Sequence, residues 1–435
     1  MKTAETKNGL IEGLELDGYT LYKGIPYAEP PVGDLRFKPP VPFGPWEGIL
    51  EAFEWGNMCL QATPAPGSFR EHEWAGDNAE YAYMDEDCLY LNIWSPAKKP
   101  DDKLPVAVWI HGGSFNHGFG HSVAFDGAAM AKRGVILVTI NYRLGVFGFL
   151  AHKELAAESE RGISGNYGLL DQIEALKWVR DNIAAFGGDP SRITIFGQSA
   201  GALSGQLLVS SPETEDMIAG AIFQSGAGYR SFGKDLPTTE KAEEMGAYYL
   251  EKAGVSSIEE LRALPGEKLL EAQLACQEGL PLGVFFGPYV DGVIVPYKPD
   301  RALELGKVKA IPYMIGATLN DMGEAEAPEG ERGMLYNGSL NMAGLIRFFG
   351  RGFVYVYDFA RQLPGDESGA FHSSELWYMF GTQDKCWRPF TEADKALSEK
   401  MLDLWTTFMK TGEPEGKDWP VFRGNPGEIK VFDVE

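Results

Sequence analysis

The stretch 192–208 (RITIFGQSAGALSGQLL) restricts the fold of this chain more than any other. It begins with β-branched and aromatic residues at 193–196, which favour a short buried strand. Gly-Gln-Ser-Ala-Gly follows at once, and leucines then recur on one side of a helical pattern. A strand that turns so sharply into a helix crowds its own backbone, and glycines two positions before and after the central residue relieve that crowding. The stretch therefore predicts a strand, a tight turn that exposes Ser199, and a helix.

A serine on such a turn has its hydroxyl projecting outward. The N–H of Ala200, at the start of the helix, would point to the place where negative charge develops during attack on a carbonyl group. Gly-x-Ser-x-Gly also occurs by chance in glycine-rich loops of α/β crossovers. The strand before it and the helix after it favour a nucleophilic serine.

Continuous apolar runs alternate with helical patterns along much of the chain. A run without polar alternation is typical of a strand buried on both faces of a parallel sheet. A long helical pattern opens at 165–172 and is stopped by Gly-Gly-Asp-Pro at 187–190. We predict an α/β fold with a large, mostly parallel central sheet and helices on both faces. The predicted strands are 105–110, 135–140, 193–196, 220–223, 311–316 and 352–359.

The remaining regions are predicted to add N-terminal strands, a helical cap and further insertions to this sheet. Within 9–50, the segments 10–13 and 19–22 are expected to be two strands of an antiparallel hairpin or meander. Glu-, Ala- and Leu-rich helical patterns at 236–280 predict a helical cap. We expect 1–435 to be a single domain, with cap or regulatory insertions at about 230–300 and 323–350. Thr391 and Asp394 match a capping-box variant at the start of a C-terminal helix.

Composition excludes several classes of function. The formal net charge of −23 argues against binding to nucleic acid or to anionic lipid. No window approaches the roughly 20 uninterrupted apolar residues that span a bilayer, and the first residues lack a signal-peptide core, so we expect a cytoplasmic protein without membrane association. The four cysteines lack the spacing of a metal site, and nothing indicates a metal or an organic cofactor. The sequence does not predict an oligomeric state.

A nucleophilic serine needs a base, and histidine is the usual one. In α/β-hydrolases the order along the chain is serine, acid, histidine. Of six histidines, only His372 follows Ser199, and it lies in a loop after the predicted strand 352–359. The acid must lie between them, and Asp321 follows the strand 311–316 after a short loop. Glu324 and Glu326 are close behind and remain alternatives.

The segment His-Gly-Gly-Ser at 111–114 follows the predicted strand 105–110. It resembles the loops in which small residues expose backbone N–H groups to a carbonyl oxygen. A simple tight turn is the alternative interpretation. Its position ahead of the serine, by about two crossovers, favours the first interpretation.

Together these motifs resemble the type B carboxylesterase family, which includes bacterial para-nitrobenzyl esterases, cholinesterases and neuroligins. The resemblance covers nearly the whole chain and rests on GIPYAEPPVG, EDCLYLNIW, HGGSF, NYRLGVFGFL, GNYGLLDQ, FGGDP, FGQSAGA, AFHSSEL, CWRPFT and TFMKTGEP. It implies the α/β-hydrolase fold.

The resemblance also implies roles for individual residues. Ser199 would be the nucleophile, His372 the general base and Asp321 the third member, where the family usually has glutamate. Gly113, Ser114 and Ala200 would form the oxyanion hole. The family's disulfide would join Cys59 and Cys88, although free thiols are expected in a reducing cytoplasm.

The predicted activity is serine carboxylester hydrolysis of small to medium esters through an acyl-enzyme on Ser199. Short acyl or aromatic esters, such as acetyl or hydroxycinnamoyl esters, are the expected substrates. Phe115, Trp377 and Phe286 are expected to line the substrate pocket, with ordinary core packing as the alternative. The competing function is a non-catalytic, cholinesterase-like adhesion or binding module. The presence of both Ser199 and His372 argues against it.

Overall fold

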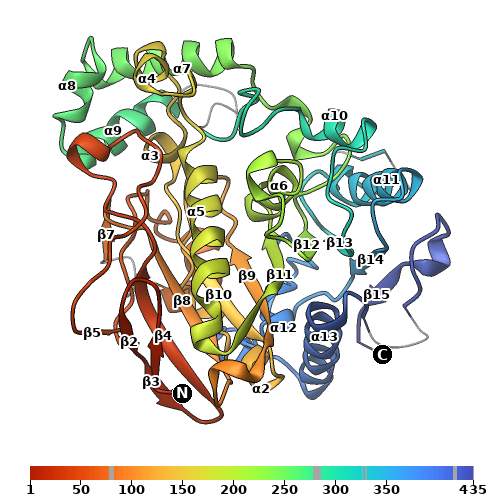
Figure 1. Ribbon diagram of the computed structural model, residues 1–435. Coiled ribbons are helices and arrows are strands. Elements are labelled where there is room, and N and C mark those ends of the chain that lie inside the picture. Colours follow the sequence, from red (N-terminus) through yellow and green to blue (C-terminus); the bar gives the residue numbers. More distant parts are fainter. Residues whose placement is uncertain (78–82, 278–285, 326, 329–330, 415–418, 435) are drawn as a thin grey trace.

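The computed structural model describes residues 1–435 apart from 78–82, 278–285, 326, 329–330, 415–418 and 435 (Figure 1). In the described part of the chain, a sheet of ten strands runs through the middle of the molecule. In spatial order its strands are β15 (Lys430–Phe432), β14 (Val354–Phe359), β13 (Tyr313–Thr318), β12 (Gly220–Gln224), β11 (Gly188–Gln198), β9 (Leu104–Ile110), β10 (Ile136–Ile140), β8 (Tyr90–Ser95), β4 (Tyr19–Pro26) and β3 (Leu14–Leu16).

The sheet is mostly parallel, as predicted. All neighbours from β15 to β10 are parallel, whereas β8, β4 and β3 extend one edge in antiparallel pairing. Because parallel strands share one direction, β9, β11, β13 and β14 all end at the same edge of the sheet. In open α/β sheets, ligands bind at this carboxyl edge.

Both faces of the inner strands are buried, which explains why these strands lack polar alternation. Along β9, Val106 and Val108 pack in one hydrophobic cluster, and Ala107 and Trp109 pack in another on the opposite face. Residues of α5, α6 and α11 contribute to the first cluster, and residues of α2, α12 and α13 to the second. Helices therefore cover both faces of the sheet, as Figure 1 shows.

The described helices range from single turns to the long α5, α7, α11 and α13. They are α1 (Phe69–Glu73), α2 (Ala128–Lys132), α3 (Gly145–Phe149), α4 (Lys153–Glu158), α5 (Tyr167–Asn182), α6 (Ala200–Leu208), α7 (Thr239–Ala253), α8 (Ile258–Arg262), α9 (Gly266–Gln277), α10 (Pro299–Glu304), α11 (Met334–Phe348), α12 (Leu376–Met379) and α13 (Glu392–Thr411). The predicted capping box begins α13, where Thr391 and Asp394 each accept the other's backbone N–H.

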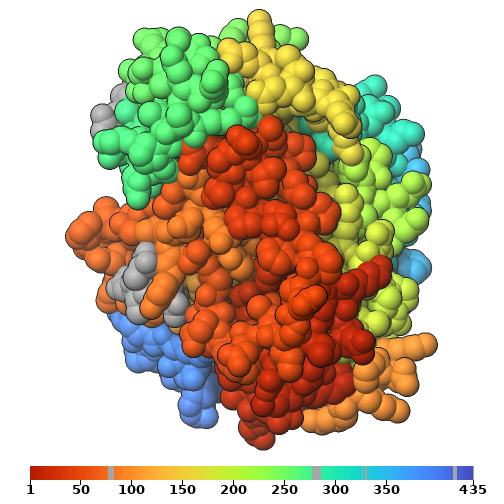
Figure 2. Space-filling view, turned by 60° about the vertical axis from the view of Figure 1, so that its left-hand side comes forward, coloured from red at the N-terminus to blue at the C-terminus, as the bar shows by residue number. Residues whose placement is uncertain are grey.

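Helices α7, α8 and α9 fall in the region predicted to form a cap. They lie together at the top of Figure 1, and in Figure 2 they sit above a face formed largely by the N-terminal part of the chain. Helix α11 lies within the other predicted insertion, but it packs against β13 and β14 and therefore covers the sheet. Among the described helices, none is long and apolar enough to cross a membrane.

The N-terminal pairing differs from the prediction. The hairpin partner of β4 is β3, joined to it through a turn at Asp17 and Gly18, a dipeptide that favours such turns. Strand β2 (Leu10–Glu12) instead pairs with β1 (Thr3–Glu5) and β5 (Ile49–Glu51) in a separate three-stranded sheet, and β6 (Met58–Cys59) pairs with β7 (Met84–Asp85). The segment 10–13 is too short to indicate its partner, because three-residue strands have little pattern of their own.

Candidate active site

Ser199 lies at the turn between β11 and α6, with φ 56° and ψ −124°. A residue with a Cβ rarely adopts this conformation, and the surrounding contacts show why the turn requires it. A Cβ on Gly201 would lie 1.9 Å from the carbonyl oxygen of Ile110, and one on Gly226 would lie 2.0 Å from that of Ser199. The start of α6 is thus pressed against the end of β9, and the predicted strand–turn–helix is confirmed.

His372 and Asp321 meet at the same edge of the sheet. The Nδ1 atom of His372 lies 2.5 Å from Oδ1 of Asp321. The backbone N–H groups of Thr318 and Met322 also donate to this carboxylate, at 3.0 and 2.8 Å. Burial would raise the pKa of Asp321, but its interaction with His372 and hydrogen bonds that include the one from Thr318 outweigh burial and lower it. Asp321 is therefore a buried, ionised partner for one nitrogen of the imidazole.

Of the two alternative acids, the structure describes only Glu324, and its partners lie away from the histidine. Glu324 lies 3.2 Å from Arg332 and accepts the backbone N–H of Gly333 at 2.8 Å. Glu326 lies outside the described residues. Of the two acids with described positions, only Asp321 contacts His372.

The second imidazole nitrogen faces a residue that the sequence did not indicate. The Nε2 atom of His372 lies 3.1 Å from the side-chain nitrogen of Gln198, the residue before the serine. An amide nitrogen only donates hydrogen bonds, so Nε2 accepts here and Nδ1 carries the proton shared with Asp321. This is the tautomer that a general base requires. Among the described residues, no hydrogen bond joins Ser199 Oγ to His372.

The loop after β9 approaches the serine closely. A Cβ on Gly112 would lie 3.1 Å from that of Ser199, and one on Gly113 would lie 1.9 Å from the carbonyl oxygen of His117. Gly113 has φ 108°, and the exposed Ser114 has φ 54°. Within the described part of the chain, no hydrogen bond takes up the N–H of Gly113, Ser114 or Ala200. Gly112 and Gly113 line the adjoining pocket, whereas Ser114 does not.

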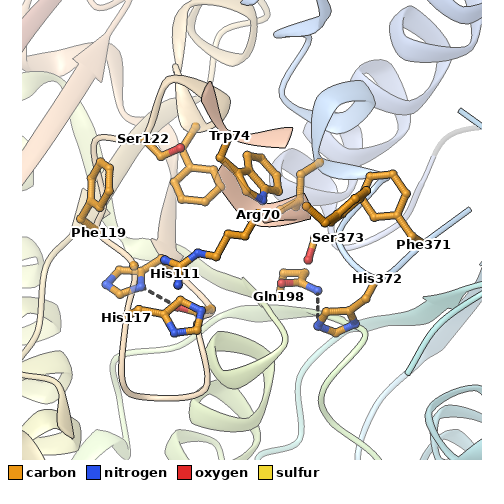
Figure 3. Close-up of a pocket in the computed structure, with 16 residues that line it drawn as sticks. Arg70, Trp74, His111, His117, Phe119, Ser122, Gln198, Phe371, His372 and Ser373 are labelled. Carbon is orange, nitrogen blue, oxygen red and sulfur yellow. Dashed lines mark hydrogen bonds between the residues drawn. The ribbon is translucent and has the colours of Figure 1, made fainter. Parts of the chain in front are cut away.

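A pocket of about 350 Å³ opens beside these groups (Figure 3). This volume fits a small molecule. Helix α1, the loop 111–125 and the loop of His372 contribute to its walls. Its described lining consists of Phe69, Arg70, Trp74, His111, Gly112, Gly113, His117, Gly118, Phe119, Ser122, Phe125, Gln198, Phe371, His372, Ser373 and Leu376.

The three aromatic residues predicted to line the pocket lie elsewhere. Phe115 is buried and packs on Phe149, and Phe286 is buried against Tyr249. Trp377 does not line the pocket but stacks on Trp74, which does. Large aromatic side chains bury much apolar area, so core packing is their ordinary role.

Glu375 is a buried acid next to this site. It accepts a hydrogen bond from Gln224 at 3.3 Å. Burial first, and the charge of Asp321 second, raise the pKa of Glu375 to about 7. Below the ordinary pKa near 4.5, Glu375 is protonated in both the folded and unfolded states. As the pH rises from about 4.5 toward 7, Glu375 ionises in the unfolded chain but keeps its proton in the folded chain. The free energy of unfolding therefore falls over this pH range.

Replacing Glu375 with glutamine is therefore expected to remove part of the pH dependence of stability. Between about pH 5 and about pH 8, the variant should gain up to about 3 kcal/mol in unfolding free energy relative to wild type. Urea unfolding of both proteins at several pH values measures this difference. A constant difference across the range would contradict the shifted pKa.

The structure adds residues that sequence reasoning missed. Gln198 lies inside a recognised motif and His117 lies two residues after one, but neither has a spacing that marks its contact. Arg70 lies in an irregular stretch without a pattern. Within the described residues, no group of three or more His, Cys, Asp or Glu side chains is placed to hold a metal ion. Cys59 and Cys88 are buried free thiols.

Comparisons with known proteins agree with this architecture. The sequence profile of the carboxylesterase family matches residues 1–330 and 331–434. A para-nitrobenzyl esterase of Bacillus subtilis (strain 168) is 35% identical over 99% of this chain and 94% of its own, and a cholinesterase of Mus musculus is 31% identical over 99% and 83%. A solved PNB esterase structure superposes with a TM-score of 0.86 at 32% identity, covering 99% of this chain and 96% of its own. The chain thus has the predicted α/β-hydrolase fold and belongs to the carboxylesterase family.

Proposed function

We propose that this carboxylesterase hydrolyses small to medium esters through an acyl-enzyme on Ser199. The observation that carries the proposal is the pairing of His372 with the buried Asp321 at the sheet edge where β11 presents Ser199. A serine hydroxyl is a weak nucleophile at neutral pH and needs a neighbouring base. Asp321 orients the imidazole and stabilises the imidazolium that forms when the base accepts the proton.

The steps follow from this arrangement. Ser199 Oγ attacks the ester carbonyl while His372 Nε2 takes its proton. Gln198 must release Nε2 at this point, because the nitrogen has one lone pair. The N–H groups of Gly113, Ser114 and Ala200 stabilise the oxyanion. The imidazolium then protonates the leaving alcohol, and water, activated by the same base, releases the acid.

The expected substrates are esters with a short acyl or an aromatic group. The pocket of about 350 Å³ and its aromatic walls support this choice, as does the name of the para-nitrobenzyl esterase. A preference for long-chain triglycerides in a profile over acyl-chain lengths would contradict it. A non-catalytic binding role is less well supported, because such a module has no need of a histidine paired with a buried acid beside a strained serine.

A fluorophosphonate probe tests the mechanism. Wild-type protein is expected to lose esterase activity as one phosphonyl group per chain is incorporated, and mass spectrometry should find it on the peptide that contains Ser199. The Ser199→Ala variant is the matched control and should remain unlabelled. Labelling of both proteins at another serine, or ester hydrolysis that survives full labelling of Ser199, would refute the proposal.

A further inference from the structure

The pocket differs in charge from the rest of the molecule. The chain carries a formal net charge of −23, yet the described lining of the pocket contains no carboxylate. Arg70 is the lining residue with a fixed positive charge. Burial lowers the pKa of His111 to about 4, and burial together with the charge of Arg70 lowers that of His117 to about 3. Both histidines are therefore neutral near pH 7, and Arg70 is the charged side chain of the described lining.

Arg70 projects into the part of the pocket where the ester would be held. Figure 3 shows its side chain running from α1 toward His111 and His117, with His372 on the opposite side. After burial, the charge of Arg70 is the next cause that lowers the pKa of His117, and both residues line the same pocket. Gly112 and Gly113 line the same pocket. A substrate whose carbonyl oxygen points at these glycines would bring its next few atoms within reach of Arg70.

Helix α1 is firmly attached to the wall that carries His372. Glu73, which is 1% exposed, forms an ion pair with the buried Arg388 at 2.9 Å. It also accepts a hydrogen bond from the indole of Trp377 at 2.8 Å.

Two aromatic residues near Arg70, one in α1 and one at its end, also pack against the wall that carries His372. The ring of Phe69 meets that of Phe371, next to His372, at 5.0 Å between centroids, and Trp74 stacks on Trp377 at 4.8 Å. The guanidinium and the imidazole are thus anchored on one packed unit. Such preorganisation reduces the entropy that binding must overcome.

We propose that Arg70 selects esters that carry a free carboxylate a few atoms from the scissile bond. This inference rests on the proposed ester hydrolysis and specifies its substrate class. A guanidinium has five N–H donors in a planar fork that matches a carboxylate, so it can bind a substrate while it also bonds to the protein. The neutral imidazole of His117 lines the same pocket and offers a further hydrogen-bonding group to the substrate.

Two matched ester pairs test the proposal and distinguish the two possible locations of the carboxylate. In the first pair, monoethyl glutarate is compared with diethyl glutarate per ester bond, and a preference for the monoester would place the carboxylate on the acyl side. In the second pair, the 4-acetoxybenzoate anion is compared with its methyl ester, and a preference for the anion would place the carboxylate on the alcohol side. In at least one pair, kcat/KM of wild type is expected to favour the anion. The Arg70→Gln variant should lower that preference, measured as the ratio of kcat/KM for the anion to kcat/KM for its neutral partner, roughly tenfold to a hundredfold.

Three controls accompany the variant. Arg70→Lys keeps the charge without the fork and should retain part of the preference. Arg180→Gln removes the charge of an exposed arginine on α5, which does not line the pocket, and should change nothing. Raising the NaCl concentration should weaken the preference of wild type, because salt screens a partly exposed charge.

The outcomes separate this inference from the proposed function. If wild type hydrolyses the neutral esters but favours neither anion, or if Arg70→Gln leaves the preference intact, the role of Arg70 is overturned and ester hydrolysis stands. If no ester is hydrolysed and the fluorophosphonate probe does not label Ser199, the proposed function itself fails. Should Arg70→Gln not fold, the NaCl series on wild type decides, since a preference that salt does not weaken would overturn the proposal.

Discussion

The Ser199→Ala variant is expected to hydrolyse para-nitrobenzyl acetate about 10⁴ to 10⁶-fold more slowly than wild type in kcat. The loss is this large because the covalent route disappears, and only the oxyanion groups and the bound geometry remain to assist water. Release of para-nitrobenzyl alcohol under saturating substrate measures the rate. The fold should persist, because the Ser199 side chain makes no capping hydrogen bond to α6.

A matched serine near the site controls for this result. Ser373 lines the same pocket and directly follows His372, so Ser373→Ala removes the same chemical group close to the site. It is expected to keep kcat within about tenfold of wild type, because it takes no part in the proton transfers. Comparable losses in both variants would show that Ser199 is not specifically the nucleophile.

The Asp321→Asn variant is expected to lower kcat about 10³ to 10⁴-fold at neutral pH. The aspartate accepts from the N–H groups of Thr318 and Met322 on its two oxygens. Asparagine has one acceptor atom and one donor atom. If its oxygen faces His372, its NH₂ group opposes the N–H of Thr318. If its NH₂ group faces His372, it forces the imidazole into the wrong tautomer.

The kinetic comparison needs an acid that lies nearby but does not contact the imidazole. Glu324 fulfils this condition through its pairing with Arg332, and Glu324→Gln is expected to leave kcat within a few-fold of wild type. Rates for both variants across the pH range, together with thermal unfolding, separate loss of catalysis from loss of structure. A severe loss in Glu324→Gln with little change in Asp321→Asn would reverse the assignment.

Much of the site could be predicted because its parts follow from local rules and chain order. The crowding at a strand-to-helix turn identifies Ser199 through its flanking glycines. His372 is the one histidine after that serine, and parallel strands bring their ends together however far apart they lie in sequence. The meeting of His372 with Asp321 needed only this topology.

The walls of the pocket could not be predicted in the same way. Arg70 reaches the site from a five-residue helix in an irregular stretch, and its position depends on Glu73 pairing with Arg388, more than 300 residues away in sequence. The sequence predicts that Phe115 and Trp377 line the pocket, with core packing as the alternative. Proximity in sequence to a catalytic motif does not decide on which side of a loop an aromatic ring packs. Both rings are buried in the core.

The left-handed backbone at Ser199 has a consequence beyond chemistry. A side chain held in a sparsely populated region of φ and ψ costs on the order of 1–3 kcal/mol, and glycine would adopt the same angles with little penalty. A chain selected for durability alone would have no reason to keep serine at this position. The strained serine therefore lowers the free energy of unfolding in order to present one hydroxyl at the site, which is an example of the trade-off between stability and activity.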